Sequence, residues 1–217
     1  MNRIRVLLVD DHAVVRAGYR VLLRGDPELE IVAEAESGER AYQLFLEHAP
    51  DVVIMDLSLP GMGGLEAIKR IIARDDSARI LVFSMHEDTA FVEQALQAGA
   101  KGYITKSSAP EVLLDAVREI AAGEVYLDRR LAQDLAMMKG GSGRFSALSP
   151  REFSIFCLLA EGLGNAAIAD RLSLSAKTVA NYSTIIKKKL GIENRAGLVY
   201  LALRHGIVQP EPSAPSD

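Results

Sequence analysis

Short apolar runs alternate with amphipathic stretches over roughly residues 4–120 of the chain. The runs are rich in Val, Ile and Leu, and they occupy residues 4–9, 31–35, 52–55, 80–83 and 102–104. Continuous apolar runs are typical of strands covered on both faces, and their alternation with helices favours right-handed crossovers between parallel strands. The pattern predicts an α/β domain built on a five-stranded, doubly wound parallel sheet.

Helix-capping residues stand where this pattern needs helices to begin. Ser37 is predicted to cap the second helix, and Gly63 with Gly64 opens the third. Ser108 followed by Pro110 fits the start of the fifth, because serine is favoured at the N-cap and proline in the first turn. The capping residues therefore support the same helix positions that the alternation of apolar runs predicts.

The second half of the chain has a purely helical pattern. A short helix is predicted near residues 127–138, followed by a glycine-rich linker at 140–143. Ser149, Pro150 and Glu152 then form a capping box for the first of four helices with tight turns, an arrangement typical of helix-turn-helix domains. The predicted organisation lists, in chain order, a first domain at 1–122, a linker at 123–147, a helix-turn-helix domain at 148–208 and a disordered tail at 209–217.

Charge is distributed unevenly between these parts. The net charge is -4, yet residues 149–210 carry 8 Lys and Arg against 4 Asp and Glu, while residues 1–148 carry 17 against 23. The basic residues cluster at Lys187, Lys188 and Lys189. A basic cluster on a helix raises nucleic acid as a partner, although for three lysines alone a solvated helix face is the favoured explanation.

Other features exclude whole classes of protein. The apolar runs are far shorter than the roughly 20 residues that a membrane span requires, so no membrane association is expected. The N-terminal residues lack a secretory pattern, and we expect a cytoplasmic protein. The single cysteine, Cys157, lies within an apolar run, where a buried hydrophobic role is expected.

Polar side chains gather at the predicted ends of the strands, where open parallel sheets bind ligands. These residues are Asp10, Asp11, Asp56, Ser84, Thr105 and Lys106. Three neighbouring carboxylates repel one another, and a hard divalent cation such as Mg²⁺ relieves that repulsion. An aspartate is also a competent nucleophile toward phosphorus, with a lysine available to neutralise the phosphoryl oxygens. The residues therefore predict a Mg²⁺-assisted phosphoryl-transfer site, although each of them singly fits a capping or surface role.

Four motifs carry a resemblance to a known family. VLLVDDH at 6–12, VVIMDLSLPGMGG at 52–64, FSMH at 83–86 and AKGYITKSS at 100–108 resemble the receiver domain of two-component response regulators, which has a flavodoxin-like fold. The resemblance implies that Asp56 is the phosphoacceptor and that Asp10 and Asp11 are the acidic pair of the metal site. It further implies that Asp11 and Asp56 bind Mg²⁺ directly, together with the backbone carbonyl of Ser58.

The same resemblance assigns roles to three further residues. Lys106 is implied to contact the phosphoryl group. Ser84 and Tyr103 occupy the positions of the family's switch pair, in which the hydroxyl moves toward the phosphate and the ring turns inward. Such a pair converts a small change of charge into a change of conformation.

The helix predicted over residues 176–190 has two different faces. At about 100° per residue, one side is a core stripe of Val179, Tyr182, Ile186 and Leu190. The opposite side carries Lys177, Ala180, Asn181, Thr184, Lys187 and Lys188. A cationic, hydrogen-bonding face suits a recognition helix in the major groove of double-stranded DNA, with Lys187 and Lys188 on phosphates and Asn181 or Thr184 at base edges.

Residues 148–199 resemble the LuxR-type helix-turn-helix domain, so that the whole chain resembles a NarL/FixJ-type response regulator. Ala180, Tyr182, and Ala166 with Ala167 depart from residues common in that family. Because fewer cations then face the DNA, nonspecific affinity is expected to be modest and tight binding to need a homodimer.

The resemblance implies a transcription regulator controlled by a sensor histidine kinase, with RNA polymerase as a further candidate partner. Its only chemistry would be its own Mg²⁺-dependent phosphorylation and dephosphorylation. Two alternatives are a phosphohydrolase or phosphotransferase acting on external substrates and a phosphate-independent binding protein. The sequence disfavours a phosphohydrolase or phosphotransferase, because Leu57 and Ser58 follow Asp56 without the additional carboxylate that aspartate-based phosphatases use as a general acid. The complete acidic set with Ser84 and Lys106 disfavours a phosphate-independent binding protein.

Overall fold

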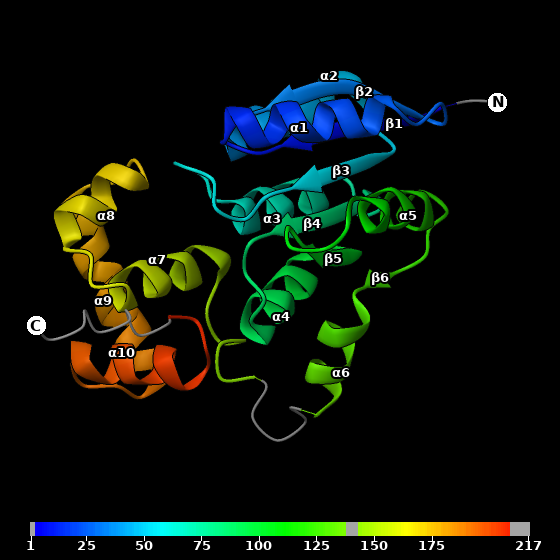
Figure 1. Cartoon of the computed structure of the whole chain (residues 1–217). Helices are drawn as coiled ribbons and strands as arrows, with labels where there is room; N and C mark the ends of the chain where they lie inside the picture. The colour runs from blue at the N-terminus through cyan, green and yellow to red at the C-terminus, as the bar shows by residue number, and fades with distance from the viewer. Residues whose placement is uncertain (1–2, 138–142, 209–217) are drawn as a thin grey trace, which may run out of the picture. The chain divides into compact units, whose positions relative to one another are not determined.

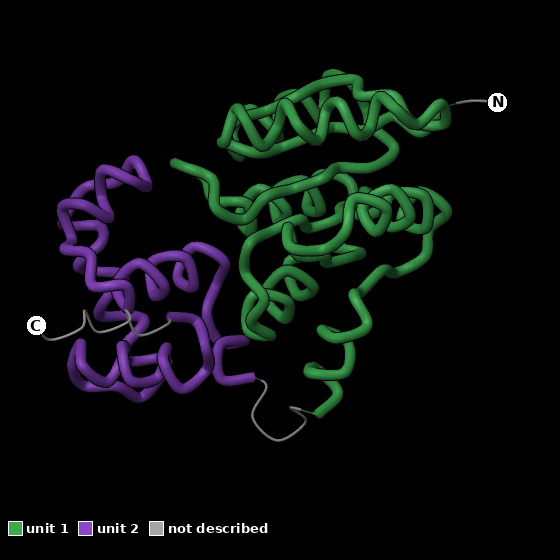
Figure 2. The backbone as a smooth tube through the Cα atoms, in the orientation of Figure 1, with its two compact units in different colours: residues 1–142 green, residues 143–217 purple. Residues whose placement is uncertain are grey.

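The computed structural model describes residues 3–137 and 143–208. The chain divides into two compact units, residues 1–142 and residues 143–217 (Figure 2). The predicted glycine-rich linker falls mostly outside the described residues, and the predicted tail at 209–217 lies entirely outside them.

The first unit is built on a parallel sheet with the strand order β2-β1-β3-β4-β5-β6. The strands are β1 (Ile4–Val9), β2 (Leu29–Ala35), β3 (Val52–Met55), β4 (Ile80–Ser84), β5 (Gly102–Thr105) and β6 (Tyr126–Leu127). The parallel, doubly wound arrangement is confirmed, and the five predicted strands are present. The sixth strand was not predicted, because two residues carry no periodic signal; it pairs Tyr126 with Gly102 and Leu127 with Tyr103.

Helices cover both faces of this sheet (Figure 1). They are α1 (Ala13–Arg24), α2 (Gly38–His48), α3 (Gly64–Arg74), α4 (Thr89–Ala98) and α5 (Pro110–Ala121). Buried residues of α1 and α5 join alternate strand residues such as Val6, Leu8 and Ile54 in one core cluster. The helices α2, α3 and α4 contact one another in that order over the opposite face. Burial on both faces explains why the central strands are continuously apolar.

The helix starts follow the sequence with one exception. The side chain of Ser37 caps α2 by accepting from the amide of Arg40, and Gly63 is the N-cap of α3. The N-cap of α5 is Ala109, so the prediction of Ser108 was wrong. The residue before a proline is held in an extended conformation, which places Ala109 at the cap. The hydroxyl of Ser108 instead lies 3.1 Å from that of Thr105.

The first unit ends in α6 (Arg129–Met137), close to the predicted short helix, and α6 packs against α4. The second unit contains α7 (Pro150–Ala160), α8 (Asn165–Arg171), α9 (Ala176–Leu190) and α10 (Arg195–Arg204). The predicted capping box of Ser149 and Glu152 is present, and Cys157 is buried as expected. None of the helices within 3–137 and 143–208 is long and apolar enough to span a membrane.

Gly64 marks the tightest backbone approach near the carboxyl-terminal end of the sheet. A Cβ atom built on this buried glycine would lie 2.0 Å from the backbone oxygen of Asp56. The first turn of α3 therefore reaches the end of β3 only because residue 64 has no side chain. This contact fixes the backbone around Asp56.

We predict that Gly64→Ala lowers the free energy of unfolding of the first unit by roughly 1–3 kcal/mol, because the backbone of Asp56 must move. Gly18→Ala is the matched control: Gly18 lies within α1 and a Cβ there meets nothing within 4 Å. It should raise the free energy of unfolding by roughly 0.5–1 kcal/mol. Urea unfolding measures the free energy of unfolding of both variants. Equal changes in the two variants would contradict the close packing of Gly64 against Asp56.

Candidate functional site

Three carboxylates meet at the carboxyl-terminal end of the sheet. Asp10 and Asp11 follow β1, and Asp56 follows β3. Since β1 and β3 are neighbours, with Val9 opposite Met55, their ends lie side by side. One oxygen from each carboxylate and a ring nitrogen of His12 all lie within 4.8 Å of one another. The predicted convergence of these aspartates is present.

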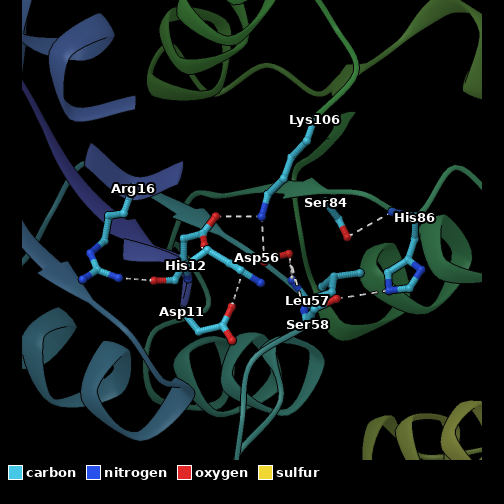
Figure 3. A network of polar contacts seen from close by, with 10 residues as sticks. Asp11, His12, Arg16, Asp56, Leu57, Ser58, Ser84, His86 and Lys106 are labelled. Atoms are coloured by element: carbon cyan, nitrogen blue, oxygen red, sulfur yellow. Dashed lines mark hydrogen bonds and ion pairs between the residues drawn. The ribbon is translucent and has the colours of Figure 1, made fainter. Parts of the chain in front are cut away.

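Lys106 links the two buried carboxylates (Figure 3). Its Nζ lies 2.7 Å from Oδ2 of Asp10 and 2.7 Å from Oδ2 of Asp56. Both aspartates are 2% exposed. Burial raises the pKa of Asp56, against the opposing effect of the Lys106 ammonium. Burial alone would lower the pKa of Lys106, but its bonds to both carboxylates raise it, so the lysine stays charged.

The second oxygen of Asp56 is held by backbone amides. Oδ1 accepts from the amide of Leu57 at 2.7 Å and from that of Ser58 at 3.4 Å. With Lys106 on Oδ2, both oxygens of Asp56 have defined partners. The carboxylate is therefore fixed in orientation before any reaction.

The acidic cluster fits a divalent cation. Oδ1 of Asp11 is buried and has no hydrogen-bond partner among the residues that the structure describes. Nδ1 of His12 lies 2.8 Å from this oxygen without forming a hydrogen bond. Carboxylate oxygens are the ligands that Mg²⁺ takes in proteins, and a buried oxygen without a hydrogen bond is costly unless something binds it. Asp10, Asp11 and Asp56 therefore form a donor set suited to Mg²⁺.

Ser84 and Tyr103 meet at a residue to which the sequence analysis gave no role. The Tyr103 hydroxyl donates to the backbone oxygen of His86 at 2.8 Å, and Oγ of Ser84 accepts from the His86 amide at 3.4 Å. Tyr103 is fully buried, and burial raises its pKa above the ordinary value. The ring of this tyrosine thus points inward in the structure described.

The imidazole of His86 connects two loops near Asp56. Its Nε2 lies 3.3 Å from Oγ of Ser58, and its ring stacks on Phe91 of α4 with centroids 3.8 Å apart. Burial, with a smaller effect of the Lys106 charge, lowers the pKa of His86 to about 4, so the ring is neutral at pH 7. The sequence shows His86 as the last residue of the FSMH motif, but nothing there indicates its contacts with Ser58 and Phe91, which is why this role was missed.

Arg16 supports the acidic loop from α1 and was also missed. Its Nη1 donates to the backbone oxygen of Asp10 at 2.5 Å, and its Nε lies 3.4 Å from Glu34 of β2. Arg20 forms a two-pronged hydrogen bond with the same glutamate. That bond, with further arginine charges, holds the pKa of Glu34 below its ordinary value despite partial burial. These contacts fix the start of the loop that carries Asp10 and Asp11.

In the second unit, the structure separates the two faces of α9 much as predicted. Val179, Ile186 and Leu190 are buried, while Tyr182 is half-buried. Of the proposed DNA contacts, Lys187 is half-buried, and the exposed residues are Lys177, Asn181, Thr184 and Lys188.

The side chains of α9 are not equally available for a partner. Oγ1 of Thr184 donates to the backbone oxygen of Ala180 at 3.1 Å. Nζ of Lys189 lies 2.6 Å from Oε2 of the buried Glu152, so this lysine joins α9 to α7. Of the three consecutive lysines, Lys187 and Lys188 therefore remain candidates for DNA contact, and their role stays a prediction.

Comparison with known proteins identifies both units. Residues 6–118 match the family described as response regulator receiver domain, and residues 146–202 match that of bacterial regulatory proteins, luxR family. The chain is 43% identical over 209 residues to the transcriptional activator protein ExaE of Pseudomonas putida, covering 94% of this chain and 98% of that protein. It is 37% identical over 212 residues to the response regulator UvrY of Escherichia coli K12, covering 96% of this chain and 97% of that protein.

Solved structures show the same likeness. RcsB from Salmonella enterica serovar Typhimurium, bound to promoter rprA in the presence of the phosphomimetic BeF3-, aligns with a TM-score of 0.69 and 29% identity over 92% of this chain and 98% of that one. A LuxR-family response regulator from Aurantimonas sp. SI85-9A1 aligns with a TM-score of 0.62 and 46% identity over 64% of this chain and 99% of that one. The chain therefore belongs to the NarL-type response regulators of two-component systems, transcription regulators that join a receiver domain to a LuxR-type DNA-binding domain.

Proposed function

We propose that this transcription regulator is switched by phosphorylation of Asp56 and that a sensor histidine kinase supplies the phosphoryl group. The supporting observation is the arrangement around Asp56, whose two oxygens are held by Lys106 and by the amides of Leu57 and Ser58. Asp10 and Asp11 stand beside it. Asp56 would therefore serve as the nucleophile, Lys106 would supply the positive charge, and Asp10 with Asp11 would supply the carboxylates for a metal ion.

The proposed reaction transfers the phosphoryl group from nitrogen to oxygen. A carboxylate oxygen of Asp56 forms a bond to phosphorus as the bond between phosphorus and the donor's imidazole nitrogen breaks, and the donor keeps that electron pair. Lys106 is placed to donate to the transferred phosphoryl oxygens, since it already lies 2.7 Å from Asp56. Mg²⁺, held by Asp11, Asp56 and the backbone carbonyl of Ser58 with Asp10 alongside, would neutralise charge on the transferring group.

We further propose that Ser84 and Tyr103 transmit this change. Both contact the backbone of His86, so movement of Ser84 toward a phosphoryl group changes the surroundings of the Tyr103 hydroxyl. The consequence proposed here is release of the second domain and formation of a homodimer on double-stranded DNA in the cytoplasm, with RNA polymerase as a further partner.

The α10 helix contributes apolar surface to the proposed dimer. Leu198, Leu201 and Ala202 are buried within their own domain, so they are not available to a partner. Tyr200 and Leu203 are 68% and 41% exposed. These two side chains support α10 as the pairing helix.

Asp56 should accept phosphate from acetyl phosphate in the presence of Mg²⁺, because the site holds its own nucleophile and charge acceptors. Intact-mass analysis should show one added phosphate on the wild type and none on Asp56→Asn. Removing Mg²⁺ with a chelator should abolish the labelling. Equal labelling of both proteins, or labelling that ignores Mg²⁺, would refute the assignment of Asp56.

DNA binding should fall steeply with salt and depend differently on two residues of α9. Lys188→Ala should weaken binding to all sequences, because a phosphate contact carries no sequence information. Asn181→Ala should cost about 1–3 kcal/mol at one base position and relax discrimination there. Fluorescence anisotropy with specific and random duplexes measures both effects.

Lys69→Ala is the matched control for the lysine variant, because Lys69 is an exposed lysine on α3 of the receiver. It should leave DNA binding unchanged. If Asn181→Ala weakens specific and random DNA alike, the placement of α9 in the major groove is wrong.

Beryllofluoride, a phosphate mimic, should convert the protein from monomer to dimer and extend its footprint to two half-sites. The reason is that one domain with a net charge of +4 over residues 149–210 offers few phosphate contacts, whereas pairing makes the second contact effectively intramolecular. Sedimentation velocity and footprinting test this, with Asp56→Asn as the unresponsive control. A monomer in both states that protects one half-site with unchanged affinity would contradict the mechanism.

A further inference from the structure

Ile185 is an apolar side chain on the exposed part of α9. It is 43% exposed, whereas Val179, Ile186 and Leu190 of the same helix are at most 4% exposed. It follows Asn181 by four residues and precedes Lys188 by three, and residues at these spacings are neighbours on a helix surface. Ile185 therefore lies on the helix face that carries the proposed DNA contacts.

Helix stability does not explain an isoleucine at this position. A β-branched residue is a poorer helix former than alanine, and an exposed apolar side chain gains little from folding. The hydrophobic core of the second unit is already supplied by the three buried residues of α9 and their partners. Its side chain is therefore available for contact with a partner outside this domain.

The polar groups around Ile185 indicate what that partner presents. Thr184 commits its hydroxyl hydrogen to the backbone oxygen of Ala180, so its oxygen can only accept a further bond. Lys188 is suited to phosphate, which leaves Asn181 as the principal side chain for reading base edges by hydrogen bonding. In the major groove, thymine differs from the other bases by an apolar group, its 5-methyl, which side chains read by apolar contact.

We propose that Ile185 is a specificity-determining residue that selects thymine by packing on its 5-methyl group in the major groove. This inference rests on the proposed placement of α9 in DNA and adds an apolar contact to the polar ones described above. The base it selects lies beside the one that Asn181 reads, because the two side chains are adjacent on the helix.

The test removes the apolar group on each side of the contact in turn: the methyl of thymine and the side chain of Ile185 beyond its Cβ. A preferred duplex is first selected from a random-sequence library with the full-length protein in the presence of Mg²⁺ and beryllofluoride. Each thymine of that duplex is then replaced singly by deoxyuridine, which differs only by the missing methyl. Affinities are measured for the wild type, Ile185→Ala and Lys188→Ala.

One thymine in each half-site should respond. At that position deoxyuridine should weaken wild-type binding about fourfold, the value of one buried methyl group. The Ile185→Ala variant should bind the thymine and deoxyuridine duplexes equally, while its thermal unfolding midpoint stays unchanged or rises. Lys188→Ala should bind both duplexes more weakly and keep the fourfold difference between them.

Two results would overturn the proposal. These are a selected site without a sensitive thymine and an Ile185→Ala variant that retains the deoxyuridine effect, whether or not this variant also weakens all duplexes equally. If no sequence is preferred at all, the proposed DNA recognition by α9 fails together with this inference, and that outcome is distinct from the other two.

Discussion

The ion pair between Lys106 and two buried aspartates is the constraint on which the site depends. Asp10 and Asp56 lie almost entirely out of water and close to each other, so both cannot be ionised without a neighbouring positive charge. Lys106 supplies that charge at 2.7 Å from each. Removing one member of a buried, hydrogen-bonded ion group leaves an uncompensated charge, which makes the three side chains interdependent. The strand order β1-β3-β4-β5 brings the group together although Lys106 lies 96 residues from Asp10 in sequence.

The close packing around Asp56 means that a change of charge there must act on neighbouring groups that are already bonded to one another. Lys106 leaves the end of β5, the strand that also carries Tyr103, and the backbone amide of Lys106 donates to the oxygen of Ser84 at 2.8 Å. His86 receives the Tyr103 hydroxyl on its backbone oxygen and stacks its neutral ring on Phe91 of α4. On the proposed phosphorylation, new negative charge that drew on Lys106 and Ser84 would act on groups already joined to α4. Close packing favours discrete rearrangement over gradual deformation, as a switch requires.

The sequence predicts those features that have strong local or topological causes. Continuous apolar runs give the five longer strands, and the convergence of strand ends gives the cluster of Asp10, Asp56 and Lys106. What it misses depends on details of tertiary contact. β6 is too short for a periodic signal, and the cap of α5 passes to Ala109 because Pro110 follows it. His86 acquires its role only when two loops meet, which no spacing in the chain reveals.

The three consecutive lysines of α9 differ in their contacts within the domain, and these contacts determine which of them remain available to a partner. Lys189 is bound to the buried Glu152, which the capping box of α7 also holds through Ser149. That lysine therefore orients α9 and cannot also neutralise a phosphate without breaking the pair. Two lysines of the cluster then remain for DNA, one of them half-buried. On the proposed DNA contacts, a single domain would neutralise few phosphates and would bind weakly, so that control over pairing would become control over binding.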